Sequence, residues 1–209
     1  MAEEVLDPSL QKIKTELTLF ALLEGGFVKR FMKAFNTAGI KLMKRPIRDS
    51  RPGFEGWTLL HHAAMLGDTK VISFLVNKGH SVDVADSSIS RVTPLMVAVT
   101  HDKGEATKEL VNLGADLSLT DMSGENAIHY GARVSGTIIK DMLFAANADK
   151  EQILALVTTP NCKSKLPEQI CSSEVVKETL VNFRVFGYIP TKVRNLPRKT
   201  RMNPLLVQA

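Results

Sequence analysis

The feature that most constrains the fold is an internal repeat in the middle of the chain. Three segments share one pattern, which starts at Thr58, Thr93 and Asn126, so the spacing is 35 and then 33 residues. In each segment an apolar pair follows 17 and 18 residues after the start, and a Gly or Asn follows 21 residues after it. A fixed period of roughly 20 to 50 residues is typical of solenoids, in which each unit buries its apolar face against its neighbours. The chain therefore predicts a stack of repeats.

Each copy carries signals for two short helices. Thr58 and Thr93, which open the first two copies, are suitable N-caps, and Pro94 is a favoured residue at the first position of a helix. The apolar residues of the second helix recur at helical spacing, which predicts one buried stripe. In every copy the second helix is expected to end at a residue that readily adopts the left-handed backbone conformation: Gly79, Gly114 and Asn147.

This pattern resembles the ankyrin repeat, a unit of about 33 residues made of a β-turn and two antiparallel helices. The residues that carry the resemblance are Gly56-Trp-Thr-Leu-Leu-His-His-Ala-Ala-Met-Leu-Gly67, Thr93-Pro-Leu-Met-Val-Ala98 and Gly124-Glu-Asn-Ala-Ile-His129. Met96 replaces the motif's His, Asp102 replaces the Gly between the helices, and Asn126-Ala127 replaces Thr-Pro. The resemblance implies an all-α repeat solenoid, an ankyrin-type helix-turn-helix stack with β-turn connections.

The repeat pattern divides the chain into five parts. Residues 1–8 form an N-terminal extension, and 9–52 a degenerate N-terminal helical repeat or cap with a basic loop. Residues 53–149 hold the three clear repeats. Residues 150–185 hold an insertion followed by a shortened C-terminal capping repeat, and within the insertion a short helix is expected at Glu151–Val157. Residues 186–209 form a basic, Pro-containing extended tail. A solenoid needs such end units because its terminal apolar faces would otherwise meet water.

Charge is segregated along the chain. The formal net charge is +5, but residues 1–52 carry +4, residues 53–183 carry −5 and residues 184–209 carry +6. The sharpest basic segments are Lys41–Arg48 and Arg194–Arg201. This asymmetry is typical of a folded body with interaction arms. The alternative is that the basic ends are solvated and only aid solubility.

The sequence carries no motif for catalysis or for a cofactor. His61 and His129 occupy the motif's own His position, where the resemblance implies bonds to the nearby Thr hydroxyl and to backbone of the next turn. His62 occupies a position where the family has an aliphatic residue. Side chains of adjacent helical residues point about 100° apart, so His61 and His62 are not expected to coordinate the same metal ion. Cys162 and Cys171 are nine residues apart with no further metal-ligand spacing, and phosphate-loop, nucleophile-elbow and His-Glu-x-x-His patterns are absent. We expect neither an enzyme nor a bound metal or cofactor.

A partner is expected on the concave face that turn tips and inner helices form in this family. The resemblance places these side chains on its outward positions: Phe54, Trp57, Met65, Leu66, Ile89, Arg91, Val92, His101, Met122, Glu125, Arg133 and Val134. Trp and Arg are the residue types found most often as interface hot spots. The alternative for Trp57 and Phe54 is local packing on Pro52 or on the N-terminal cap.

The tail has a different character from the repeats. Pro190, Pro197 and Pro204 recur every seven residues, which favours extended chain over a long helix. Its apolar side chains are too many for a free polar linker. The cations expected to contact a partner are Lys192, Arg194, Arg198, Lys199 and Arg201.

These observations favour a non-enzymatic protein–protein interaction module, a scaffold or adaptor subunit that docks through its concave face and basic tail. Its partner is expected to be a protein with a partly acidic surface. The alternative is a protein that binds nucleic acid, or an anionic polymer such as a microtubule, through the basic segments; the 6% aromatic content provides no stacking platform for bases. Two cysteines, an acidic N-terminus and the lack of a long apolar run predict a cytoplasmic protein without membrane contact, with cytoskeletal association as an option.

Overall fold

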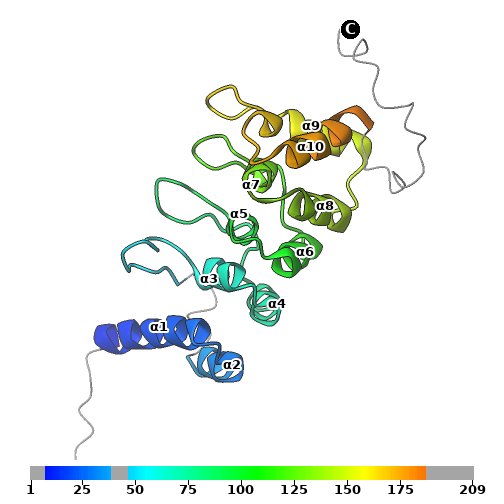
Figure 1. Cartoon of the computed structure of the whole chain (residues 1–209). Helices are drawn as coiled ribbons and strands as arrows, with labels where there is room; N and C mark the ends of the chain where they lie inside the picture. Colours follow the sequence, from blue (N-terminus) through cyan, green and yellow to red (C-terminus); the bar gives the residue numbers. More distant parts are fainter. Residues whose placement is uncertain (1–7, 39–46, 187–209) are drawn as a thin grey trace, which may run out of the picture.

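The computed structural model describes residues 8–38 and 47–186, and these form one stack of helices with loops along one side (Figure 1). The described residues hold ten α-helices and one short 3-10 helix. The predicted all-α repeat solenoid is therefore confirmed. Residues 41–46 of the basic segment Lys41–Arg48 lie outside the described residues, as do the tail cations Lys192, Arg194, Arg198, Lys199 and Arg201.

Four helix pairs follow one another along the chain and build two rows. The pairs are α1 (Pro8–Glu24) with α2 (Val28–Thr37), α3 (Leu59–Leu66) with α4 (Thr69–Asn77), α5 (Pro94–Thr100) with α6 (Gly104–Asn112), and α7 (Ala127–Val134) with α8 (Gly136–Ala145). Helices α1, α3, α5 and α7 pack side by side as the inner row, and α2, α4, α6 and α8 as the outer row (Figure 1).

The C-terminal end of the stack departs from this regular pairing. Helix α9 (Lys150–Thr158) follows α8 directly, and the short helix expected at Glu151–Val157 forms part of it. The 3-10 helix η1 (Pro167–Gln169) then takes the place of an inner helix, and α10 (Glu174–Phe186) packs on η1 and α9. The last unit thus keeps its second helix and shortens its first.

Local sequence signals start the inner helices as expected. The Thr58 backbone N–H donates to His61 Nδ1 at 3.1 Å, and the Thr93 hydroxyl accepts from the Met96 N–H at 3.4 Å. The Asn126 side chain accepts from the His129 N–H at 3.1 Å, so Asn replaces Thr as a cap without loss of the helix start.

Left-handed residues end the outer helices at the predicted positions. The φ angles of Gly79 and Gly114 are both 92°, and that of Asn147 is 47°. Between α3 and α4 the chain turns at Gly67 with φ 80°, and the equivalent turn of the next pair is made by Asp102 with φ 51°. A side chain in this region costs roughly 1 kcal/mol, so Asp102 holds its turn against a small backbone strain.

The apolar core runs unbroken from the N-terminal pair to the end of the stack. Val71, Ile72 and Leu75 of α4 are fully buried. At the N-terminal end, the rings of Phe31 and Phe35 lie 6.4 and 5.5 Å from the ring of Phe74 on α4. The α1–α2 pair is thus packed into the stack through its own aromatic residues.

Candidate partner-binding face

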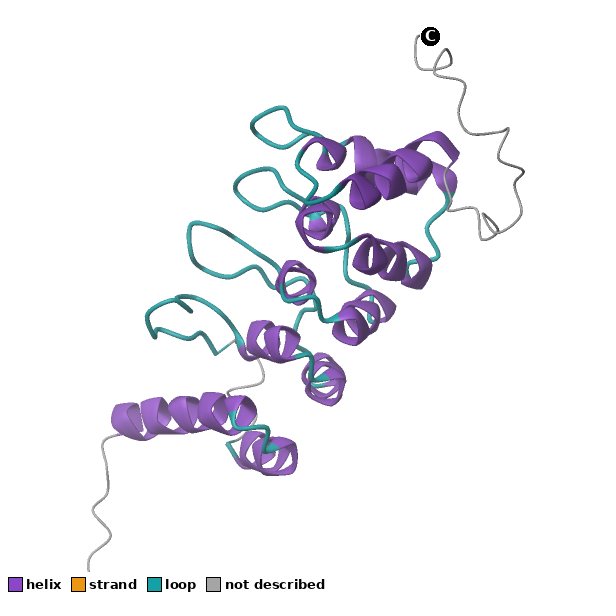
Figure 2. Ribbon diagram, in the orientation of Figure 1, coloured by secondary structure: helices purple, strands orange, loops and turns teal. Residues whose placement is uncertain are grey.

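Four loops, here called the fingers, project from the inner-row side of the stack and are drawn as teal hairpins in Figure 2. They comprise residues 49–57, 86–92, 121–125 and 161–165. In each finger the first residue's N–H donates to the carbonyl oxygen of the last residue. These bonds are Asp49–Trp57 at 2.6 Å, Asp86–Val92 at 2.9 Å, Asp121–Glu125 at 3.0 Å and Asn161–Lys165 at 3.0 Å. The fourth finger therefore belongs to the same series as the three whose helices carry the full pattern.

Backbone hydrogen bonds also join each finger to the next. The Ser87 N–H donates to the Gly56 carbonyl at 3.3 Å, the Met122 N–H to that of Ser90 at 3.0 Å, and the Cys162 N–H to that of Ser123 at 2.8 Å. At Gly56, where φ is 82°, a Cβ atom would stand 2.7 Å from the Ser87 nitrogen. Glycine is thus needed at this junction, and the four fingers form one ordered row.

Two buried histidines of the inner helices hydrogen-bond to the last residue of the following finger, as the ankyrin resemblance implies. His61 Nδ1 accepts from Thr58, so Nε2 donates to the Val92 carbonyl at 3.0 Å. His129 Nε2 lies 3.3 Å from the Lys165 carbonyl in the same way. Burial lowers the pKa of His61 to about 4, so the ring is neutral near pH 7. The structural role expected for both histidines is confirmed.

Apart from Glu125, the side chains expected to contact a partner fall into two groups, one exposed to solvent and one half-buried. On the finger tips Ile89 is 88% and Met122 59% exposed. Leu66, Arg91, His101 and Arg133 are also exposed, whereas Phe54, Trp57, Met65, Val92 and Val134 are half-buried. The Trp57 ring lies 5.4 Å from Phe54 and 5.5 Å from His62, in keeping with the local packing considered as the alternative. Trp57 therefore braces the first finger and offers only part of its surface.

Glu125 lies inside the structure, and the expectation that it faces a partner is wrong. Its residue is 7% exposed, and its Oε1 pairs with Arg133 and accepts from Asn161 Nδ2 at 2.9 Å. Burial alone would raise the pKa of Glu125, but the bonds from Arg133 and Asn161 keep it below the usual value. Glu125 thus ties the third finger to the fourth.

A second group of charged side chains, here called the ionic cluster, lies where the first finger meets α1. It comprises Glu24, Asp49, Arg51 and His62. Arg51 Nη2 lies 2.6 Å from Glu24 Oε1 and 2.6 Å from Asp49 Oδ2. The fully buried His62 lies 3.0 Å from Asp49 through Nε2 and 3.3 Å from Glu24 through Nδ1. The cluster therefore fastens α1 to the first finger and to α3.

The charges of the ionic cluster shift one another's protonation. Burial lowers the pKa of His62, and the neighbouring carboxylates only partly offset this. Hydrogen bonds from Arg51 lower the pKa of Glu24, and they outweigh burial to lower that of Asp49 as well. Both carboxylates are thus ionised near pH 7.

Glu24, Asp49 and His62 could together offer three ligand atoms to a metal ion, all within 4.8 Å of one another. The Arg51 guanidinium already contacts both carboxylates and supplies the positive charge that a cation would bring. A divalent ion there would stand beside an arginine. We therefore assign the cluster as an ion-pair network.

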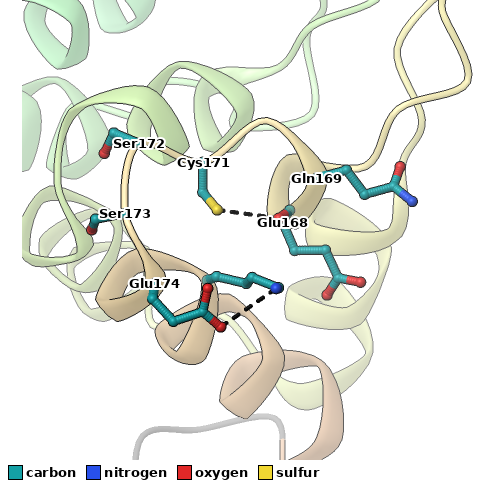
Figure 3. A pocket seen from close by; sticks show the side chains of 7 residues that line it. Glu168, Gln169, Cys171, Ser172, Ser173 and Glu174 are labelled. Atoms are coloured by element: carbon teal, nitrogen blue, oxygen red, sulfur yellow. Dashed lines mark hydrogen bonds and ion pairs between the residues drawn. The ribbon is translucent and has the colours of Figure 1, made fainter.

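A depression between η1 and α10 is polar and its charges are paired (Figure 3). The Cys171 thiol donates to the Glu168 carbonyl at 3.2 Å, and Lys177 pairs with Glu174 at 3.4 Å. Arg184 pairs with the Glu168 side chain at 3.1 Å. These contacts stabilise the end of the stack.

Across the described ranges, no helix has both the length and the apolar character that crossing a membrane requires.

Comparison with known proteins gives the class of the chain. Residues 19–121 match the family model for ankyrin repeats, with three copies. The match begins within α1, upstream of the first clear copy in the sequence. The protein is an ankyrin-repeat protein, and such repeats indicate a protein–protein interaction module.

Several curated proteins are similar over part of the chain. Protein PhlB of Serratia liquefaciens is 32% identical over 83 residues, which cover 40% of this chain and 36% of that protein. Protein phosphatase 1 regulatory subunit 12A of Rattus norvegicus is 28% identical over 141 residues, covering 65% and 13%. Neurogenic locus notch homolog protein 1 of Xenopus tropicalis is 26% identical over 90 residues, covering 43% and 4%. The chain thus spans about a third or less of the length of these relatives.

Proposed function

We propose that this protein is a non-catalytic scaffold or adaptor subunit, and that it binds its partner across the finger row. The observation that carries the proposal is the combination of order and exposed apolar surface on adjacent fingers. Ile89 and Met122 project from loops that backbone hydrogen bonds hold in place, so little conformational entropy is lost when a partner covers them. Exposed apolar side chains on an ordered base are typical of interaction surfaces.

The charges of the fingers favour an acidic partner surface. The exposed cations of the second and fourth fingers are Arg91, Lys163 and Lys165. Asp49, Asp86 and Glu125 are buried within the fingers, and the half-buried Asp121 accepts from the Tyr130 hydroxyl, so Glu55 is the exposed acid of the four fingers. A finger row whose exposed charges are mostly positive attracts acidic side chains at the rim of the interface and raises the rate of association with an acidic partner.

The basic tail, residues 186–209, supplies the second docking element of the proposal. The tail has five Lys and Arg residues and no Asp or Glu, which suits a partly acidic protein surface. The alternative occupant is a nucleic acid or an anionic polymer such as a microtubule. The two cysteines of the chain favour a reducing compartment such as the cytoplasm for this role.

The test compares two double substitutions that remove equal numbers of exposed apolar side chains. Ile89→Ser with Met122→Ser changes the finger tips, whereas Phe144→Ser with Val175→Ser changes α8 and α10. Partners recovered by affinity purification are quantified by mass spectrometry for wild type and for each variant. We expect the finger variant to lose the specific partners and the control to retain them. Equal recovery with both variants would contradict the proposal.

A further inference from the structure

The outer row changes its charge character from one end of the stack to the other. Helix α2 and the α4 unit carry Lys29, Arg30, Lys33, Lys70 and Lys78, and among the described residues none of these cations has a carboxylate within 4 Å. The α6–α8 portion is different, because Lys108 there pairs with Glu105 at 3.1 Å and with Asp141 at 3.5 Å. The unpaired cations of α2 and α4 are here called the outer cationic face.

The outer cationic face lies on a rigid base. Phe31 and Phe35 of α2 pack against Phe74 of α4, so the opposite, solvent side of α2 presents Lys29, Arg30 and Lys33. The Lys78 ammonium lies 5.5 Å above the Phe74 ring, which fixes a fourth cation beside the seam between the helices. The cations thus stand on two helices whose relative position is set by buried aromatic contacts.

The surrounding sequence does not neutralise this face. Between Gly25 and Arg48 the chain has seven Lys or Arg residues and no Asp or Glu. The carboxylates that flank this stretch in the sequence, Glu24 before it and Asp49 after it, both pair with Arg51. Like charges gathered on one surface repel one another, and a bound anion relieves that repulsion.

We propose that the outer cationic face is a second docking surface, separate from the fingers, and that its ligand is an acidic polypeptide segment. Charge complementarity requires an anion. A single-stranded nucleic acid would also need stacking surfaces. Phe27 is the exposed aromatic residue of the described part of this region, and the Arg30 guanidinium lies over one side of its ring, 5.4 Å from the ring centre.

A membrane surface fits the outer cationic face less well than a polypeptide. A helix that lies on a membrane turns its apolar side to the lipid. In α2 the apolar side, with Phe31 and Phe35, is buried against the stack, and the exposed side is polar. A Glu- or Asp-rich segment needs only the cations that this side presents.

The test measures binding of a fluorescein-labelled peptide of alternating Glu and Gly to the full chain, by fluorescence anisotropy at low salt. The variant Lys29→Glu, Arg30→Glu, Lys33→Glu removes three cations of the face. The matched control Lys140→Glu, Lys150→Glu, Lys177→Glu makes the same change in net charge on α8, α9 and α10, away from both proposed docking surfaces. We expect the first variant to bind at least about tenfold more weakly and the control within about twofold of wild type.

Equal weakening by both variants would overturn the proposal, because net charge rather than this face would then govern binding. No binding by wild type at low salt would also overturn it, as would tighter binding to phosphatidylserine vesicles or to a single-stranded oligonucleotide of equal charge. The neutral variant Lys29→Gln, Arg30→Gln, Lys33→Gln, checked by circular dichroism, repeats the test if charge reversal perturbs folding. Ile89→Ser with Met122→Ser is expected to leave peptide binding unchanged, so failure of the finger proposal is read separately.

Discussion

The first and third fingers share one backbone frame but are fastened to the stack in different ways. Both are closed by a hydrogen bond between their end residues, and both carry a glycine with positive φ two residues before the N-cap of the following helix. In the first finger, Asp49 is held within the ionic cluster by Arg51 and the fully buried His62. In the third, Glu125 is held by Arg133, whose side chain is 45% exposed. The repeat pattern thus sets the loop, and residues outside the pattern set how firmly each loop is anchored.

The largest effect is expected from loss of the carboxylate at the centre of the ionic cluster. Asp49→Ala leaves Nε2 of the buried His62 without its acidic partner, with Glu24 remaining beside Nδ1, and removes the link between Arg51 and the finger. Breaking such a buried ion pair costs about 4 kcal/mol of unfolding free energy. Urea denaturation measures it, with Glu55→Ala as the exposed carboxylate control in the same finger. A loss no larger than the control's would show that the cluster does not anchor the finger.

Acidification is expected to weaken the support beneath the second finger. The pKa of His61 is about 4 in the folded protein and about 6.5 when unfolded, so the unfolded chain binds the proton first as pH falls. Stability therefore decreases between pH 6.5 and 4, by up to about 3 kcal/mol from this residue. Glu24 and Asp49 have lowered pKa values, so their contribution is lost only at still lower pH.

Urea denaturation at pH 7 and at pH 4.5 measures this loss, and His61→Gln is expected to reduce the pH dependence; burial also lowers the pKa of His62, His80 and His129, which supply the remainder. An unchanged slope in the variant would mean that His61 is not the titrating group.

A smaller effect is expected from the third finger. Glu125→Ala frees the exposed Arg133 to water and leaves the amide of Asn161 without its partner, at a cost of about 2 kcal/mol. Because Arg133 is half in solvent, added salt should reduce this cost more than that of Asp49→Ala. Denaturation series at two salt concentrations compare the variants directly. The reverse order, with Glu125→Ala more costly, would overturn the comparison of the two fingers.

The smallest effect is a gain. Asp102 adopts a positive φ where Gly67 stands in the preceding pair, so Asp102→Gly should relieve backbone strain and raise stability by about 1 kcal/mol. Asp116→Gly, at an exposed position that does not have positive φ, is the control and should not stabilise. A decrease for Asp102→Gly would show that the weak 3.5 Å contact from Ser135 outweighs the strain.

Much of the fold is predictable from the sequence because its signals are local. The caps at Thr58 and Thr93 and the left-handed ends at Gly79, Gly114 and Asn147 depend on residues within one turn of the chain. The shortening of an inner helix to η1 follows from packing at the end of the stack, which no local pattern records.

The candidate site is less predictable, because its anchors join distant segments. His62 is visible as a departure from the family pattern, but its partners Glu24 and Asp49 come from α1 and the first finger. Glu125 occupies an outward position by register, yet Asn161 of the next finger draws it inward. The direction of a side chain on a turn depends on contacts with the neighbouring repeat, so its position in the repeat pattern does not by itself predict whether it faces solvent.

The most direct test of the finger proposal is hydrogen–deuterium exchange of the full chain with and without a purified partner. We expect the partner to slow exchange at the finger tips, in peptides that contain residues 87–91, 122–124 and 162–164. Protection confined to α10 and the residues that follow it, with no change at these tips, would contradict the central claim that the finger row is the binding face.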